Sequence, residues 1–396
     1  MNATDDSVGI QLEPVDTWFF SDGTPSPADS SGQRATGGVF PPYPGTVVGA
    51  VRAALARAND WSGRDAWPAE LTAVLGDGYG PEDLGTLRFD GPYLLRCGEP
   101  VFPVPAHLLG GRGADDHWIA TDALRPGSPV LCDLGEVRLP EPSPGTDATV
   151  LEPARAAWLT AAELARVVTG GLPAGPPLER TTLWHDEHRV GIARDNRART
   201  VREGMLYSAV HARLERGVSI GVRVSGLPPG WRRPDDGEAI PFGGEGRLAR
   251  WRKWDGAAPS PTVPAEVGEH GRLTVIALTP LDAGTEVYRG QAAPQGLAGA
   301  TLVSACLPGP QRVGGWGQVP KTGPLPLHSV LPAGSVLFCE GADADRLRKA
   351  ASASDGPLRI GHRQRWGFGA VALTTWSALG PDQPASPQSS VSEVYG

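Results

Sequence analysis

The pattern of apolar and polar positions predicts one run of secondary-structure elements in the N-terminal half of the chain. Short alternating stretches are typical of half-buried strands, and longer ones with a 3.6-residue period are typical of helices. In chain order the pattern predicts a strand at 8–14, a helix from Thr46 to about Ala58, a strand at 87–95, a helix opened by the Thr160–Glu163 capping box and ended by Gly170–Gly171, and a short strand at 190–193.

A hairpin is expected next. Residues 205–214 and 218–224 both alternate, and Glu215, Arg216 and Gly217 lie between them as a turn would.

A second run of similar elements follows a stretch rich in Pro, Gly and Asp at 227–246, which we take as the domain boundary. In chain order it predicts buried strands at 273–278 and 336–339, a short helix at 343–351, a loop rich in Gly and Arg at 359–369, and a last strand at 370–375.

The order strand, helix, strands, helix, strand thus occurs about twice. Strands and helices do not alternate regularly, as they would in a fold with a parallel sheet. The predicted fold class is α+β, with two ferredoxin-like (RRM-like, βαββαβ) domains that carry long insertions rich in Gly and Pro. The expected domains are residues 1–226 and 227–379, followed by a flexible polar tail at 380–396.

Composition narrows the function classes. The formal net charge of −8 excludes a chain that coats nucleic acid through its overall charge, so any such contact must come from local basic patches. Lysine occurs only at Lys253, Lys321 and Lys349, so almost all of the 36 basic residues are arginines. Two alternative explanations fit that bias. One is a GC-rich genome, and the other is the use of guanidinium groups to bind phosphates.

The four cysteines form no CxxC pair, and we expect them to be buried free thiols in a reducing cytoplasm. The first residues, MNATDDSVGIQLEP, are acidic and lack the apolar stretch of a signal peptide. We expect a cytoplasmic protein without a metal or another cofactor.

The loop RIGHRQRWGFG at 359–369 is the strongest candidate site. Its glycines free the backbone for close approach to a ligand, its cations supply charge, and its aromatic rings supply stacking faces. The residues of this set are Gly361, His362, Arg363, Arg365, Trp366, Gly367, Phe368 and Gly369, with Arg359 beside them. A tight glycine turn with solvated arginines is the alternative.

Two further basic stretches are candidates for nucleic-acid contact. The segment 188–202 has a local surplus of positive charge, and 247–254 places Trp251 and Trp254 among basic residues. The alternatives are a solvated loop for the first stretch and core tryptophans for the second.

The signals for catalysis are poor. WHDEH at 184–188 lacks the HExxH spacing, and no GxSxG or P-loop motif occurs. His185, His188, Tyr207 or His211 could pair as acid and base in RNA cleavage, but their spacing selects none of them.

Several stretches together resemble one family. They are LEPVDTWFFSDGTP, GGVFPPYPGTVVGAVRAAL, LRFDGPYLL, FPVPAHLL, HRVGIARDNRARTVREGMLYS, PFGGEGRLARW, GGWGQVPKTGPLPLHSVLPAGSVLFC and GHRQRWGFGAV. In this order, from Leu12 to Val371, the chain resembles the RAMP-superfamily third subunit of the Cmr-type (type III-B) CRISPR effector complex. It departs from that family at Ser21, where an arginine would be expected.

The resemblance implies two ferredoxin-like domains and a non-catalytic role. Such subunits bind the repeat-derived 5′ handle of the CRISPR RNA (crRNA). They also bridge the large polymerase/cyclase-like subunit to the RAMP backbone filament subunit.

We therefore expect the loop 361–369 to contact handle phosphates, with Trp366 or Phe368 stacking a base. Arg52, Arg194, Arg197 and Arg199 are further expected phosphate contacts. Two alternatives stay open, namely a RAMP endoribonuclease that processes precursor crRNA and the equivalent type III-A subunit or a protein scaffold.

Overall fold

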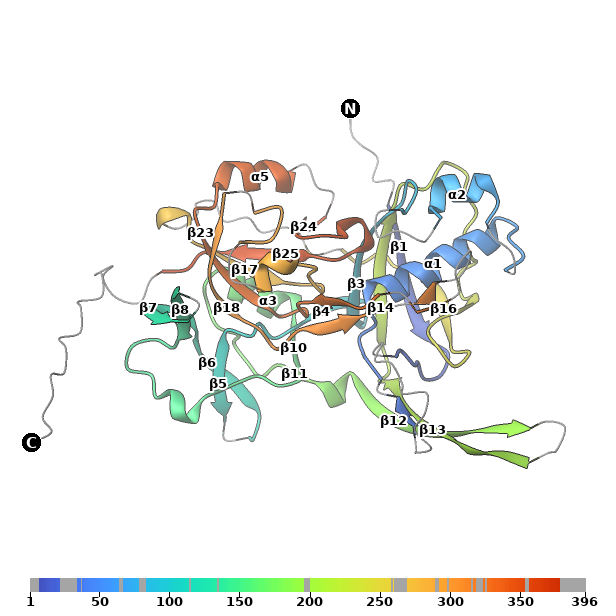
Figure 1. Ribbon diagram of the computed structural model, residues 1–396, viewed down its shortest axis with the longest axis horizontal. Coiled ribbons are helices and arrows are strands. Elements are labelled where there is room, and N and C mark those ends of the chain that lie inside the picture. The colour runs from blue at the N-terminus through green and yellow to red at the C-terminus, as the bar shows by residue number, and fades with distance from the viewer. Residues whose placement is uncertain are drawn as a thin grey trace, which may run out of the picture.

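Two antiparallel sheets and the helices that cover them make up the body of the molecule in the computed structural model (Figure 1). The structure describes residues 7–21, 34–36, 38–63, 67–77, 83–113, 115–133, 135–195, 200–257, 259, 269–288, 292–297, 299–314, 316–317, 323–324, 326–352 and 356–377. The predicted mixed class of helices and mainly antiparallel strands is confirmed. The expected tail at 380–396 lies outside the described residues.

The first sheet has eight strands in the order β11-β10-β4-β3-β14-β1-β16-β15 among the described residues. Its strands are β1 (Val8–Pro14), β3 (Arg88–Arg96), β4 (Glu99–Pro103), β10 (Ala157–Thr160), β11 (Leu178–Glu179), β14 (Val218–Ser225), β15 (Ala239–Pro241) and β16 (Leu248–Lys253). The strand that comes first in the chain, β1, lies inside the sheet between β14 and β16.

The second sheet has five strands in the order β18-β23-β17-β25-β24 in the part of the chain that is described. Its strands are β17 (Leu273–Ala277), β18 (Thr301–Cys306), β23 (Val336–Glu340), β24 (Leu358–Arg359) and β25 (Ala370–Thr374). Its first strand, β17, likewise lies inside, between β23 and β25. The two sheets thus repeat one arrangement.

The helices of the described residues are α1 (Pro44–Ala58), α2 (Ala69–Leu75), α3 (Ala161–Val168), α4 (Thr285–Tyr288) and α5 (Ala344–Ser352), with the 3₁₀ turns η1 (Ala148–Val150), η2 (Arg180–Thr182), η3 (Glu269–Gly271) and η4 (Gln364–Trp366). Three of the helices, α1, α3 and α5, agree with the sequence pattern except at their ends, whereas α2 and α4 were not predicted.

The predicted N-cap of α3 is confirmed, because the Thr160 hydroxyl accepts a hydrogen bond from the Glu163 amide at 3.3 Å. The predicted cap of α1 is wrong. That helix starts two residues before Thr46, because Pro44 already has the backbone angle of a first helical turn, and Tyr43 is the N-cap.

The predicted hairpin of 205–214 with 218–224 is wrong. The partner of β13 (Thr200–Leu214) is the preceding strand β12 (Trp184–Asp195), and the two form a long hairpin that projects from the body (Figure 1). The following strand, β14, is buried on both faces and enters the first sheet instead, between β1 and β3. A strand with two apolar faces is stabilised most in a sheet interior.

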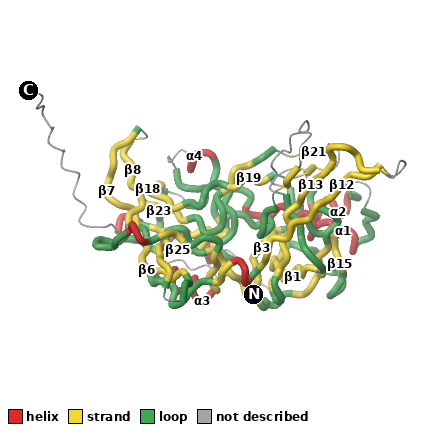
Figure 2. Tube along the Cα trace, turned by 90° about the horizontal axis from the view of Figure 1, so that it is seen from below, coloured by secondary structure: helices red, strands yellow, loops and turns green. Residues whose placement is uncertain are grey.

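Smaller sheets complete the described part of the fold. β2 (Arg34–Thr36) pairs with β13, and β5 (Leu108–Arg112) pairs with β6 (Trp118–Ala123) and β9 (Glu152–Pro153). The remaining strands form two-stranded pairs, namely β7 (Arg125–Cys132) with β8 (Gly135–Glu141), β19 (Gln311–Val313) with β22 (His328–Val330), and β20 (Trp316–Gly317) with β21 (Gly323–Pro324). Figure 2 shows β7 and β8 at one end of the elongated molecule and β12 and β13 at the other.

The stretch 227–246, where the sequence suggested a domain boundary, leads back into the first sheet. The strand that follows it, β16, pairs with β1 in a register that sets Trp251 opposite Leu12. The second sheet begins only at Leu273.

The two sheets share a hydrophobic core. Tyr93 and Phe102 of the first sheet are in the same buried cluster as Val336 and Phe338 of the second, and α3 contributes Leu164. Of the four thiols, Cys306 and Cys339 are buried, and burial raises the pKa of each to about 12. Cys97 and Cys132 are exposed, so the expectation that all four are buried is wrong. No helix in the described ranges is long and apolar enough to cross a membrane.

Candidate functional site

The glycine-rich loop connects β24 to β25 and is folded back on its own sheet. Gly361, Gly367 and Gly369 all have positive φ, which only glycine adopts readily. The amide of Gly361 donates to the Gln295 carbonyl at 2.6 Å, and that of Gly369 donates to the Pro280 carbonyl at 2.9 Å. The amides of the three glycines are therefore already bonded within the protein, since Gly367 donates to the Gln364 carbonyl, and the expectation that these amides bind phosphate has no support in this conformation.

The loop arginines are also engaged. Arg365 donates from Nη2 to the Leu87 carbonyl at 2.8 Å and to the Gly85 carbonyl at 2.5 Å. Arg363 donates from Nε to Asp282 at 2.8 Å, and its guanidinium lies 4.3 Å from the centre of the Phe368 ring. Guanidinium groups held this way are partly withdrawn from solvent, and their first role in the structure is to fix the loop.

The aromatic rings of the loop face inward. Phe368 is 1% exposed and packs with Val313 and Val330, so it cannot stack a base in this conformation. Trp366 is half-buried against the first-sheet core. Of the predicted loop set, His362 is the exposed side chain.

Arg52 of α1 is buried, contrary to the expectation that it contacts phosphate. Only 4% of it is exposed, and Nη2 donates to the Gly76 carbonyl at 3.0 Å. Its guanidinium lies 4.8 Å from the ring centre of Trp67 and 5.7 Å from that of Trp366. Burial lowers the pKa of Arg52 to about 10, which leaves it charged at neutral pH.

The second predicted basic stretch lies on the projecting hairpin. Arg194 belongs to β12, where its backbone is described, and Arg197 and Arg199 lie outside the described residues.

In the third basic stretch, around Trp251, the tryptophans are core residues, which was the alternative to nucleic-acid contact. Trp251 and Trp254 are buried core residues, and Arg252 is paired with Glu13 and Asp236.

A groove of about 320 Å³ lies between the two sheets and is lined mainly by proline and aromatic side chains. Its aromatic residues are Phe40, Tyr43, Tyr93 and Trp158, and its prolines are Pro41, Pro42, Pro92, Pro103, Pro280, Pro308 and Pro332. The indole Nε1 of Trp158 is buried without a hydrogen-bond partner among the described residues.

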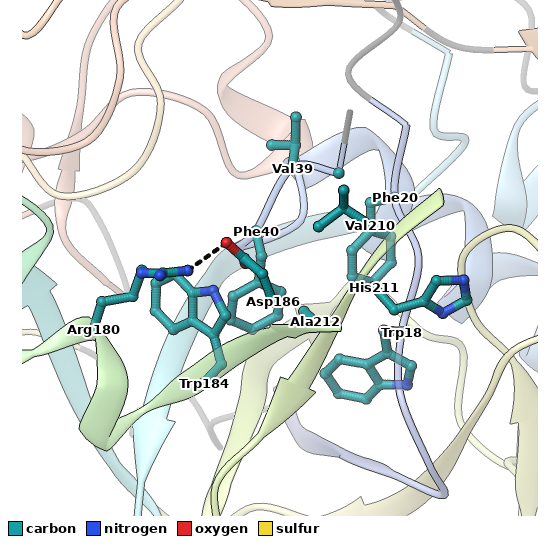
Figure 3. Close-up of a pocket in the computed structure, with 11 residues that line it drawn as sticks. Trp18, Phe20, Val39, Phe40, Arg180, Trp184, Asp186, Val210, His211 and Ala212 are labelled. Atoms are coloured by element: carbon teal, nitrogen blue, oxygen red, sulfur yellow. Dashed lines mark ion pairs between the residues drawn. The ribbon is translucent and has the colours of Figure 1, made fainter. Parts of the chain in front are cut away.

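A second, smaller pocket of about 220 Å³ lies at the base of the β12–β13 hairpin (Figure 3). Trp18, Phe20 and Trp184 form part of its wall, and an ion pair of 2.7 Å between Arg180 and Asp186 lies at its side. Val39 and Phe40 line this pocket as well as the groove. The two cavities are therefore neighbours on either side of one segment of chain.

Charged residues hold the hairpin base against the body. Asp16 accepts from Arg189 at 2.9 Å and from Arg213 at 3.2 Å, and Glu187 bonds to the same two arginines. The hydrogen bond from Arg189 lowers the pKa of Asp16, and that from Arg213 lowers the pKa of Glu187. This network ties Glu187, Arg189 and Arg213 of the hairpin base to Asp16 of the body.

The histidines of the alternative nuclease interpretation do not form one site. His211 is 2% exposed, its Nδ1 lies 3.1 Å from the Thr17 hydroxyl, and burial lowers its pKa. His185 Nε2 lies 3.0 Å from Glu215. His188 is three positions from His185 on the same strand and therefore on its opposite face.

Sequence reasoning missed the groove. Its walls come from segments as far apart as Phe40, Pro92, Trp158 and Pro332, and no local pattern joins them. The described residues contain no group of three His, Cys, Asp or Glu side chains placed to hold a metal ion.

A family model described as "CRISPR-associated protein (Cas_Cmr3)" matches residues 10–376. No curated protein matches the chain. Among solved structures, the chain is similar to one in the cryo-EM structure of the Type III-B Cmr-beta bound to cognate target RNA, with 15% identity, a TM-score of 0.47, and coverage of 93% of this chain and 99% of that one. It is also similar to a chain in the crystal structure of the Csm3-Csm4 subcomplex of the type III-A CRISPR-Cas interference complex, with 9% identity, a TM-score of 0.38, and coverage of 93% and 99%.

Proposed function

The chain belongs to the Cas_Cmr3 family of CRISPR-associated proteins, and from that premise we propose that it is a non-catalytic, RNA-binding subunit of a cytoplasmic type III-B effector complex. In this proposal it binds the 5′ repeat-derived handle of crRNA. It also bridges the large polymerase/cyclase-like subunit to the RAMP backbone filament subunit.

We further propose that each large sheet is one ferredoxin-like unit. The strands β3-β14-β1-β16 and β18-β23-β17-β25 both follow the order in which the first strand lies between the third and the fourth. The helix expected between the third and fourth strands is α5 in the second unit, whereas the first unit has the stretch 226–247 in its place. The proposed boundary then falls after β16 and before β17.

The groove between the sheets is the observation on which the proposed RNA binding rests. Single-stranded RNA is bound through unstacked bases that lie against aromatic and apolar side chains, and its phosphates need cations near by. The groove offers the half-buried rings of Phe40 and Tyr43 as aromatic faces, and its prolines as further apolar surface. The neighbouring hairpin-base pocket would take an adjacent nucleotide.

Two exposed arginines are the proposed phosphate contacts. Arg155 lies between Ala154 and Ala156, which line the groove, and Arg312 follows Gln311, which also lines it. Neither forms an ion pair with another described residue. The exposed His362 of the glycine-rich loop remains a proposed contact, and so do Arg194 of β12 and, outside the described residues, Arg197 and Arg199.

Binding of labelled handle RNA to the full chain tests this function. We expect the handle to bind more tightly than a scrambled RNA of the same length. The variants Arg155→Ala and Arg312→Ala should each lower the slope of log affinity against log salt by about 0.7, the value for one phosphate contact on a single strand.

Arg346→Ala, which removes an exposed arginine of α5, is the charge-matched control and should leave the slope unchanged. Equal affinity for handle and scrambled RNA would contradict handle recognition. Release of a cleaved product from repeat RNA by the wild-type chain alone would contradict the non-catalytic role.

A further inference from the structure

Three contacts join the glycine-rich segment of the second sheet to β3 of the first sheet and to the residues just before it. Arg359 Nη2 lies 2.6 Å from Asp90 Oδ1, and the side chains are 18% and 13% exposed. Arg365 donates to the carbonyls of Gly85 and Leu87, just before β3 begins. These contacts are polar, largely withdrawn from solvent, and cross from one sheet to the other.

A fourth contact is aromatic. The Arg52 guanidinium lies near Trp67 on its own side of the molecule and near Trp366 of the loop, at 4.8 and 5.7 Å from the ring centres. Cation–π contacts are strongest when the cation is withdrawn from water, as Arg52 is.

Two of the contacts of the loop reach residues that line the groove or bond to them. Asp90, which pairs with Arg359, also accepts the hydroxyl hydrogen bond of Tyr93 at 2.5 Å, and Tyr93 and Pro92 line the groove. On the other side, the Pro280 carbonyl that accepts from Gly369 belongs to a residue of the opposite wall. One short loop is thus bonded to both walls.

Arg363 differs from its neighbours in the loop. Its partner Asp282 belongs to the same half of the chain as the loop itself, so this pair crosses no boundary. The loop therefore contains two kinds of arginine, and their variants should behave differently.

We propose that Arg359 and Arg365 are positioning residues that hold the two walls of the groove at a fixed separation, and that they act on RNA binding without touching RNA. This inference rests on the proposed function only for the nature of the ligand. It assigns to these two arginines a role opposite to direct phosphate contact, because their guanidinium groups are bonded within the protein before RNA arrives.

The direction in which one substitution changes RNA affinity distinguishes a positioning role of Arg359 from a phosphate contact. Asp90→Asn removes a negative charge and releases Arg359. If Arg359 contacted phosphate, handle RNA would bind more tightly to this variant. As a positioning residue, Arg359 loses its anchor, and we expect handle affinity to fall about tenfold, as the loss of a buried charged hydrogen bond implies.

The salt dependence gives a second criterion. Arg365→Ala should weaken handle binding about tenfold with an unchanged salt slope, whereas a lost phosphate contact would lower the slope by about 0.7. Arg363→Ala is the matched control, since it removes the same charge from the same loop. Its effect on affinity should be clearly smaller.

Hydrogen exchange without RNA tests the wall contacts independently of the ligand. Arg365→Ala and Asp90→Asn should speed amide exchange in peptides covering 85–95 as well as 358–369. Arg363→Ala should do so in 358–369 and around Asp282 but not in 85–95.

The outcomes separate the two proposals. The wild-type chain could bind no handle RNA while amide exchange in the variants changes as described. That result would support the contacts between the walls and contradict the proposed RNA ligand. Tighter binding by Asp90→Asn, a lower salt slope for Arg365→Ala, or unchanged exchange at 85–95 would overturn the positioning role.

Discussion

Gly367 of the glycine-rich loop lies so close to Gly91 of β3 that a Cβ atom on residue 367 would sit 1.7 Å from the Gly91 carbonyl oxygen. Gly91 belongs to the first sheet, and Gly367 lies three residues before β25 of the second. The backbones of the two halves thus touch at a point where any side chain would separate them.

Gly367→Ala should therefore destabilise the protein by about 3 kcal/mol, because overlap with rigid backbone adds to the strain of a positive φ. Gly230→Ala is the control, since Gly230 also has a positive φ but no atom within 4 Å of its would-be Cβ. That variant should cost about 1 kcal/mol. Urea unfolding measures both, and equal losses would show that the backbone contact does not matter.

His107 should make stability depend on pH. Burial lowers its pKa to about 4, from 6.5 in the unfolded chain. Between these values the unfolded chain binds a proton that the folded chain does not. Stability should therefore fall as the pH decreases from 6.5 towards 4, by up to roughly 3 kcal/mol.

His107→Leu should flatten this part of the profile of unfolding free energy against pH. The exposed His328 offers the control variant His328→Leu, which should keep the wild-type profile. A wild-type profile for His107→Leu as well would contradict the assignment.

The ion pairs of Asp16 should affect stability at a lower pH than His107 does. Because Arg189 lowers the pKa of Asp16 below 3.8, its contribution is fully present above the unfolded value and is lost as the pH falls through the lowered folded value. Asp16→Asn should therefore lower stability at pH 7 by at most about 1 kcal/mol, since the pair is half exposed.

The difference between Asp16→Asn and wild type should shrink only in strong acid. Asp60→Asn, which affects the more exposed pair with Arg232, should cost less at pH 7. A constant difference down to the most acidic pH would show that the charge of Asp16 is not what stabilises the hairpin base.

Arg52 should influence stability rather than the salt dependence of RNA binding. Arg52→Ala opens a cavity between Trp67 and Trp366 and leaves the Gly76 carbonyl without its donor, so we expect a loss of about 3 kcal/mol. Arg52→Met refills much of that volume and should cost less. A salt slope lowered by about 0.7 in Arg52→Met would instead place Arg52 on a phosphate.

Local patterns sufficed for single elements. The period-2 alternation at 8–14 predicts β1, and Thr160 followed by Glu163 predicts the start of α3, because these signals depend on residues a few positions apart. The recurring order of elements also led to the mixed class with antiparallel sheets. The partners of those elements did not follow from the same patterns.

Partner choice was decided by tertiary structure. Val218 to Val224 alternates well enough for a hairpin with 205–214. However, β14 pairs with β1, about 210 residues away, and with β3, about 130 residues away. Burial of both its faces outweighs the entropy of closing the longer loops, which grows only slowly with loop length.

The amino-acid sequence was enough to predict single elements such as β1 and α3, the acidic balance and the family resemblance, and it marked the segment 359–369 as unusual. The contacts of that segment could be known only from the folded chain. Arg365 bonds to Leu87, nearly 280 residues away, and Phe368 packs on Val313 and Val330, about 40 to 55 residues away. Composition shows that a guanidinium or a ring is present, but only the packing of distant segments shows whether it faces a ligand or the protein's own carbonyls and core.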